Sequence, residues 1–539
     1  METDRRGVRA EAGTVVAVLG LALLSLGAAL GRSGRLTYHE AIVAQGAREM
    51  LASGRWLVPT LGGGPWLEKP PLAHWLVALV GWAAGGVDEA VARAPAAAAG
   101  AALGVAVAVL ASRRLGPRLA LLAGAVQVTS AWTVMRGRLA EADIVLACLV
   151  GWALVAFDGL RAGPGGGAGR PGWWRWRWAF FALWGGTALA KGVLFGGVLV
   201  GATAAAVLAW DRDREALRAL AWAPGWLLAG GVALAWPTAV LARHPEALGL
   251  WTQHIVGRLA ARPGPFAGEP WWSYALAPLA QVLPWTPLAL AGAVPSLARA
   301  ARHRGGVDRL LWAWAVVPAA LVSAATVRNG HYLIHALPPW SIWAALGLAR
   351  LGRRLRDRGW AADRVRRRGA AAVVGLAVAY ALGFGLLGPP LDRRGGEWAF
   401  YEAAGRAVGP GEPLVLLYDD WDRDPYVTPF GPVPHDLAVR LFYLNRPSCA
   451  WSTARGLAGR PLVPGWATLA VIGRDRDVPA LRRLGRVETI ARGPGRRWDR
   501  TFCLFRVTPE ADRPAARPGE RAPVRRDDGG AHREAGPAR

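Results

Sequence analysis

Long apolar segments separated by short polar ones fill the chain from residue 13 to residue 388. A helix needs about 20 apolar residues to cross a bilayer, and inside lipid only helices satisfy the backbone without a closed barrel. The pattern therefore predicts a bundle of transmembrane helices. The expected spans are residues 13–31, 91–111, 118–135, 139–158, 178–191, 193–210, 219–241, 274–298, 308–326, 332–350 and 369–388.

The loops between these spans alternate in their arginine content. Arginine-rich loops all fall on one side of the membrane when the apolar stretch 72–87, which is too short to span, does not cross. Cytoplasmic loops carry the excess of basic residues. This predicts an all-α polytopic membrane protein with about 11–13 transmembrane helices, a cytoplasmic N-terminus and an extracytoplasmic C-terminal domain.

The character of the sequence changes after the last apolar segment. Short apolar runs such as PLVLLY and TFCLFRVT alternate with turn-rich stretches over residues 390–509, which predicts a small external α/β domain. Residues 510–539 lack apolar periodicity, so we expect a disordered tail. Residues 1–389 then form the transmembrane domain, with external loops at 32–90 and 242–273.

Composition supports a membrane protein rather than a nucleic-acid-binding one. The chain has 539 residues, is 53% hydrophobic and 19% charged, and carries a formal net charge of +26. Its basic residues sit between apolar segments and in the tail, whereas a nucleic-acid-binding domain places them along one face of a soluble fold. We therefore expect the bilayer, and no nucleic acid, as a partner.

Polar and charged residues gather in the predicted external segments. His39 and Glu40 open a helical stretch in the first loop, and Glu68 and Lys69 follow a glycine triplet. A further external junction contains Arg136, Arg138, Glu141 and Asp143. Charges at the edge of lipid are costly when unpaired, so their collection there favours a functional site.

These segments resemble the GT-C class of membrane glycosyltransferases, specifically the protein O-mannosyltransferase and aminoarabinose–lipid A transferase (ArnT-like) group. The first loop, HEAIVAQGAREMLASGRWLVPTLGGGPWLEKPPLAHW, is similar to a long family motif. RGRLAEAD, ALAKG and RNGHYLIHALPPW follow in the family's order. The resemblance covers most of residues 13–350. One departure is His39, which stands where the family has the aspartate assigned to catalysis, whereas Glu40 keeps the second acid.

The resemblance implies transfer of a sugar from a polyprenyl phosphate to an acceptor on the outer face of the membrane, with inversion. The acceptor would be lipid A, another envelope glycan or a protein. It also implies a multi-pass protein of the bacterial cytoplasmic (inner) membrane, and we expect a monomer. Two rival functions remain open: a transporter or flippase for a lipid-linked substrate, and a non-catalytic scaffold with an external binding domain.

Specific residues follow from the matched motifs. Glu40 or His39 would be the general base, since an inverting transfer needs a group that deprotonates the acceptor. Lys69 and Arg258 would bind the donor phosphate. Residues expected to contact or orient the phosphate or the sugar are Glu68, Arg138, Asp143, His254, His331 and Tyr332. No cofactor is certain, and a divalent metal, zinc or magnesium, held by His39 and Glu40 is one hypothesis.

Overall fold

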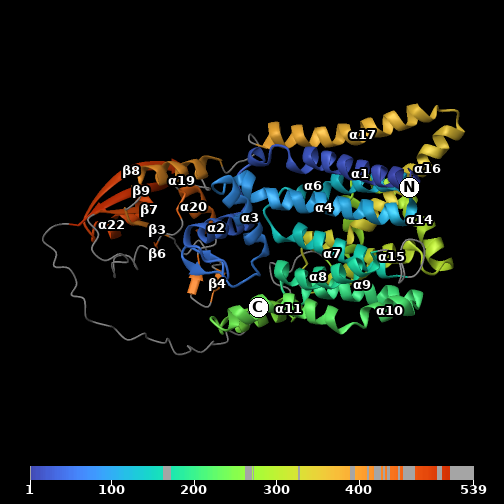
Figure 1. Ribbon diagram of the computed structural model, residues 1–539. Coiled ribbons are helices and arrows are strands. Elements are labelled where there is room, and N and C mark those ends of the chain that lie inside the picture. The colour runs from blue at the N-terminus through green and yellow to red at the C-terminus, as the bar shows by residue number, and fades with distance from the viewer. Residues whose placement is uncertain are drawn as a thin grey trace, which may run out of the picture.

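The computed structural model shows a long helical bundle with a small sheet-containing domain at one end and the N-terminus at the other (Figure 1). We call the end that carries this domain the domain end. The structure describes residues 2–161, 172–260, 270, 272–325, 328–388, 395–409, 412–417, 426–428, 431–433, 437–446, 450–452, 468–494 and 501–509. The predicted disordered tail, 510–539, lies outside the described residues.

Helices make up nearly all of the bundle. Their bounds are α1 (Glu2–Ala22), α2 (Tyr38–Ser53), α3 (Leu72–Ala84), α4 (Glu89–Leu115), α5 (Pro117–Thr129), α6 (Ala131–Gly137), α7 (Ala142–Leu160), α8 (Trp173–Lys191), α9 (Phe195–Asp211), α10 (Arg214–Leu220), α11 (Ala223–Leu241), α12 (Ala247–Ala260), α13 (Ser273–Gln281), α14 (Thr286–Arg302), α15 (Val307–Ser323), α16 (Pro338–Asp357) and α17 (Ala362–Leu382). Short helical turns are η1 (Leu23–Gly27), η2 (Leu30–Arg32), η3 (Gly330–Ala336) and η4 (Gly383–Leu387), and a hairpin pairs β1 (Thr60–Leu61) with β2 (Gly64–Pro65).

Among the described residues, five helices are long and apolar enough to cross a membrane, or seven if each of two bent pairs counts as one span. The rest of the expected 11–13 spans stays a prediction. The α3 helix has 13 residues, which agrees with the expectation that this stretch does not cross.

Several predicted spans are interrupted, among them the following two near the domain end. The predicted span 118–135 is two helices, α5 and α6, which meet at a 59° bend because Ser130 adopts an extended conformation. The predicted span 332–350 begins with the η3 turn, and α16 starts only at Pro338. Proline is favoured in the first helical turn, where its missing N–H costs nothing. Both breaks turn polar side chains toward one region.

Close helix packing in the bundle depends on glycine. A Cβ at Gly292 of α14 would lie 1.8 Å from the carbonyl oxygen of Trp343 in α16, and one at Gly347 of α16 would lie 2.0 Å from the carbonyl oxygen of Leu288. Small residues allow such close approach of two helix backbones, which is a common way for membrane helices to associate.

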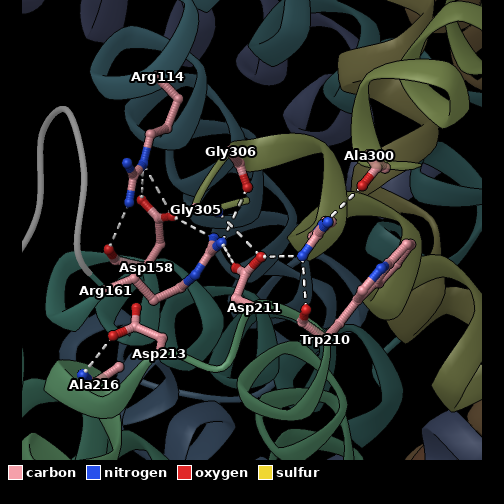
Figure 2. Close-up of polar contacts among 11 residues, drawn as sticks. Arg114, Asp158, Arg161, Trp210, Asp211, Asp213, Ala216, Ala300, Gly305 and Gly306 are labelled. Atoms are coloured by element: carbon pink, nitrogen blue, oxygen red, sulfur yellow. Dashed lines mark hydrogen bonds and ion pairs between the residues drawn. The ribbon is translucent and has the colours of Figure 1, made fainter. Parts of the chain in front are cut away.

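The end of the bundle opposite the domain is held by a buried ion network (Figure 2). Asp158 of α7 accepts hydrogen bonds from Arg114 of α4 and from Arg161. Arg161 also donates to Asp211 of α9, which pairs with Arg309 of α15 at 3.0 Å. Four helices are thereby tied together by charges that almost no water reaches, since the side chains of Arg161 and Asp158 are fully buried.

The predicted α/β domain is present at the domain end. Its five-stranded sheet has the order β6-β3-β7-β9-β8. The strands β6, β3 and β7 are parallel, whereas β9 runs antiparallel to both β7 and β8. The elements of this domain are α19 (Gly395–Ala407), β3 (Leu414–Leu417), β4 (Tyr426–Thr428), β5 (Gly431–Val433), α20 (Leu437–Leu444), β6 (Ala450–Ser452), β7 (Leu469–Gly473), η5 (Asp475–Asp477), α22 (Val478–Leu481), β8 (Arg486–Pro494) and β9 (Thr501–Thr508).

The domain packs directly on α2, and one hydrophobic core runs through both. The Arg48 guanidinium of α2 donates to the carbonyl of Phe442 and lies over its ring, 4.2 Å from the centroid. The Tyr443 hydroxyl accepts a hydrogen bond from the backbone N–H of Leu36, just before α2. The helix that carries His39 is therefore held between the bundle and the domain.

Candidate functional site

A cluster of charged side chains lies where α6, α7, α8 and η3 meet at the domain end. At its centre is Asp143 in the first turn of α7, whose side chain is 10% exposed. The Lys191 ammonium, at the last residue of α8, donates to Asp143 Oδ1 at 2.5 Å, and Arg136 Nη2 lies 3.6 Å from Oδ2. One buried carboxylate thus holds two cations from two other helices in place.

Aromatic rings of η3 and α9 lie beside the lysine. The Lys191 Nζ lies 4.5 Å from the centroid of the Tyr332 ring and 5.2 Å from that of Phe195. His331 packs edge-on against Tyr332 with centroids 4.5 Å apart. Burial, together with the cations Lys191 and Arg136, lowers the pKa of His331 to about 3 although Asp143 opposes this effect, so its imidazole is neutral near pH 7.

Glu141 is a second acid of the cluster. It precedes α7, and its Oε2 accepts a hydrogen bond from Arg136. Desolvation is the largest influence on this carboxyl, and the neighbouring carboxylates of Asp143 and Glu40 act in the same direction. Together they raise its pKa to about 7 against the opposing effects of Arg136 and Lys69. Such a group changes its protonation state within the physiological range.

Lys69 and His39 border the cluster. The Lys69 side chain is 35% exposed and lies 3.8 Å from its neighbour Glu68, whose own side chain is only 8% exposed. Lys69 is electrostatically coupled to Glu141, and His39 to His331. His39 is exposed in the first turn of α2. Six of the predicted residues, His39, Glu68, Lys69, Asp143, His331 and Tyr332, therefore border one region.

Glu40, in contrast, is completely buried and points into the protein. Its Oε1 accepts from Arg93 Nε at 2.7 Å and from the backbone N–H of Ala140 at 3.2 Å. Its Oε2 accepts from the backbone N–H of Thr37 at 2.8 Å and from Arg93 Nη2 at 3.5 Å. With four donors around the carboxylate, this geometry opposes the expectation that Glu40 takes a proton from an acceptor. Glu40 instead forms the capping box of α2 and ties this helix to α4.

Arg138 also points away from the cluster, contrary to the prediction that it contacts the donor. It donates to the carbonyls of Ser25 and Leu26 and to the hydroxyl of Ser33. Its guanidinium lies over the ring of Phe384. These contacts secure the end of the first helix, where the backbone changes from α1 through η1.

Other predicted ligands remain without a structural test. His254 and Arg258 fall on α12, but their side chains lie outside the described part of the chain. The described residues contain no group of three His, Cys, Asp or Glu side chains that could hold a metal ion. His39 is exposed whereas the Glu40 carboxylate faces Arg93, so these two residues do not form a pair of ligands.

Three residues were absent from the predicted site: Arg136, Glu141 and Lys191. All three lie in the polar junction or in the ALAKG segment singled out from the sequence. Arg136 and Arg138 are two residues apart at the end of a short helix, and the sequence alone does not tell which of them faces the cluster. The bend between α5 and α6 decides that Arg136 does.

Comparison with known proteins agrees with this arrangement. Residues 39–240 match the family model of dolichyl-phosphate-mannose-protein mannosyltransferases. The fold superimposes on the crystal structure of ArnT from Cupriavidus metallidurans bound to undecaprenyl phosphate with a TM-score of 0.70 and 20% identity, over 91% of this chain and 97% of that one. The chain therefore has the fold of ArnT, and its sequence is similar to the same family. The resemblance noted in the motifs is confirmed.

The curated relatives to which this ArnT-like protein is similar are arabinosyl transferases. The undecaprenyl phosphate-alpha-4-amino-4-deoxy-L-arabinose arabinosyl transferase of Edwardsiella ictaluri is 30% identical over 326 residues, which are 59% of this chain and 56% of the relative. A second such transferase, from Sodalis glossinidius, is 28% identical over 317 residues, or 58% of this chain and 55% of the relative. The match thus spans little more than half the length of these relatives.

Proposed function

We propose that this protein is a membrane glycosyltransferase that moves a sugar from a polyprenyl phosphate to an acceptor at the domain end of the bundle. The relatives named above are transferases that act on an undecaprenyl phosphate sugar, and the solved ArnT binds undecaprenyl phosphate. The acceptor class is lipid A or another envelope component. The setting is the bacterial inner membrane, with the domain outside.

One observation carries the proposal: Arg136 and Lys191 flank Asp143 at the domain end of the bundle, and the charge of Lys69 acts on the neighbouring Glu141. When the bond between the sugar and the phosphate breaks, the phosphate gains negative charge. Fixed cations stabilise this charge most strongly where water is scarce. Lys69 is the most accessible of the three, because its side chain is 35% exposed whereas those of Arg136 and Lys191 are 12% and 11% exposed.

The apolar surroundings suit a donor that arrives through the membrane. Its polyprenyl chain would remain in lipid beside the helices, and its phosphate would lie at their ends. Tyr332 and His331 of η3 offer a ring face and a neutral imidazole beside Lys191, which are groups that bind sugar hydroxyls. The acceptor then attacks the sugar carbon opposite the phosphate, as an inverting reaction requires.

Turnover by purified protein in lipid vesicles tests the proposal. Undecaprenyl phosphate carrying different sugars would be supplied with lipid A and with crude envelope acceptors. We expect release of undecaprenyl phosphate and a glycosylated acceptor, and we expect Lys69→Gln to lower the rate about 100-fold. Arg55→Gln is the matched control, because Arg55 is exposed in the same loop. Equal loss in both variants, or no loss in Lys69→Gln, would contradict the assignment of Lys69.

A further inference from the structure

An inverting transfer needs a base, and the position of the family aspartate is His39 in this chain. Glu40 is surrounded by four donors and has no contact with solvent. Asp143 is bound by Lys191 and faces Arg136. Glu68, at the border of the cluster, has its Oε1 3.8 Å from the Lys69 ammonium. The other carboxylate at the centre of the cluster is Glu141.

The geometry of Glu141 differs from that of Glu40 and Asp143. Arg136 orients it through Oε2, whereas the described residues offer no hydrogen bond to Oε1. The side chain is 13% exposed, so it is mostly shielded and still reaches solvent. A carboxylate oriented by one oxygen and open at the other can accept a proton from a bound hydroxyl group.

The charges that act on Glu141 come from several elements around it. Arg136 of α6 and Lys69, ahead of α3, favour the ionised carboxylate. Asp143 of α7 and Glu40 of α2 oppose ionisation, and so does desolvation, which is the largest effect. The result is a pKa of about 7. A base with a pKa near the working pH combines a large ionised fraction with a strong tendency to take a proton.

We infer that Glu141 is the general base that deprotonates the acceptor hydroxyl. The acceptor oxygen forms the new bond to the sugar carbon as its proton passes to Glu141 Oε1. The bond from that carbon to the phosphate oxygen breaks, and its electron pair leaves with the phosphate beside the cations of the cluster. The protonated Glu141 then releases the proton to water. This role rests on the proposed function.

The test compares Glu141→Gln with wild-type protein in the vesicle assay and in a separate measurement of undecaprenyl phosphate binding. We expect the transfer rate to fall about 100- to 10,000-fold, which is the usual contribution of a general base. Donor binding should be unchanged or tighter, because a negative charge is removed near the phosphate. Glu488→Gln, at an exposed position of β8, is the matched control.

The pH profile separates a base from a structural residue. The wild-type rate should rise with pH through about 7 as Glu141 ionises, and the small residual rate of Glu141→Gln should not. Glu141→Asp, which keeps a carboxylate, should retain the rise at a lower rate, and it also serves if the Gln variant fails to fold. A flat Glu141→Asp profile would contradict the inference.

Two outcomes overturn the inference in distinguishable ways. If wild-type protein transfers sugar and Glu141→Gln does so at the same rate with the same pH profile, the base lies elsewhere, and loss of transfer in His39→Ala would point to His39. If wild-type protein binds undecaprenyl phosphate but transfers no sugar, the proposed function fails and the role of Glu141 fails with it.

Discussion

Replacing Glu40 by Gln separates a structural anchor from a catalytic base. In the folded protein the carboxylate accepts two hydrogen bonds from Arg93 and two from backbone N–H groups. A Gln side chain keeps only one of the two oxygen acceptors. The N–H groups that donated to the other oxygen therefore lose their acceptor. Arg93 then has only neutral acceptors around its charge, namely the retained Gln oxygen and the carbonyls of Leu30, Gly34 and Arg35.

The expected cost follows from this loss. Hydrogen bonds to charged groups contribute about 1.5–3 kcal/mol each, and removal of one partner of a buried ion pair costs about 3–5 kcal/mol. We therefore expect Glu40→Gln to lower the free energy of unfolding by about 3–5 kcal/mol, since the pair is fully buried. Thermal unfolding in detergent should show this as a melting temperature several degrees lower.

Two comparisons make this result decisive. Glu402→Gln removes a partner of Arg35 from a partly exposed pair, so it should cost less than about 1 kcal/mol. The double variant Glu40→Gln/Arg93→Met should be more stable than the sum of the single changes, because the unpaired charge is gone. If Glu40→Gln melts like wild type and binds donor normally, yet transfers no sugar, Glu40 is the base and this reasoning is wrong.

Three further predictions concern other parts of the molecule. Gly292→Ala should separate α14 from α16 and lower the free energy of unfolding by about 1–3 kcal/mol or more. Gly230→Ala in α11, where an added Cβ would meet open space, should be neutral or stabilising. Equal melting temperatures for the two variants would contradict this. Asp211→Asn should lower the melting temperature without changing the KM for donor, because its network lies at the opposite bundle end, where α9 leads into α10 (Figure 1). A raised KM with unchanged stability would refute this. Lys191→Met should weaken undecaprenyl phosphate binding in a titration, because Asp143 then loses its nearest cation and keeps only Arg136. Unchanged affinity would remove Lys191 from the site.

The order of apolar and polar segments in the sequence determined much of the architecture of this protein. It predicted a helical membrane bundle and a C-terminal α/β domain, because burial in lipid demands long apolar helices whereas a sheet needs short alternating runs. Together with the matched family motifs, this order placed Asp143, Lys69, His331 and Tyr332 in one site, since each belongs to a polar segment at the end of an apolar one. It also identified residues 72–87 as too short to cross, and α3 is indeed 13 residues long.

Only the tertiary structure decided which of several neighbouring charges has which role. Glu40 lies next to His39 in sequence, but a helix turns about 100° per residue, so Glu40 faces Arg93 inside the protein while His39 is exposed. Arg136 and Arg138 diverge for a related reason at the end of α6. The pKa of Glu141 depends on desolvation and on charges from α2, α6 and α7 together. Such effects arise between segments that are distant in sequence, so no local pattern could predict them.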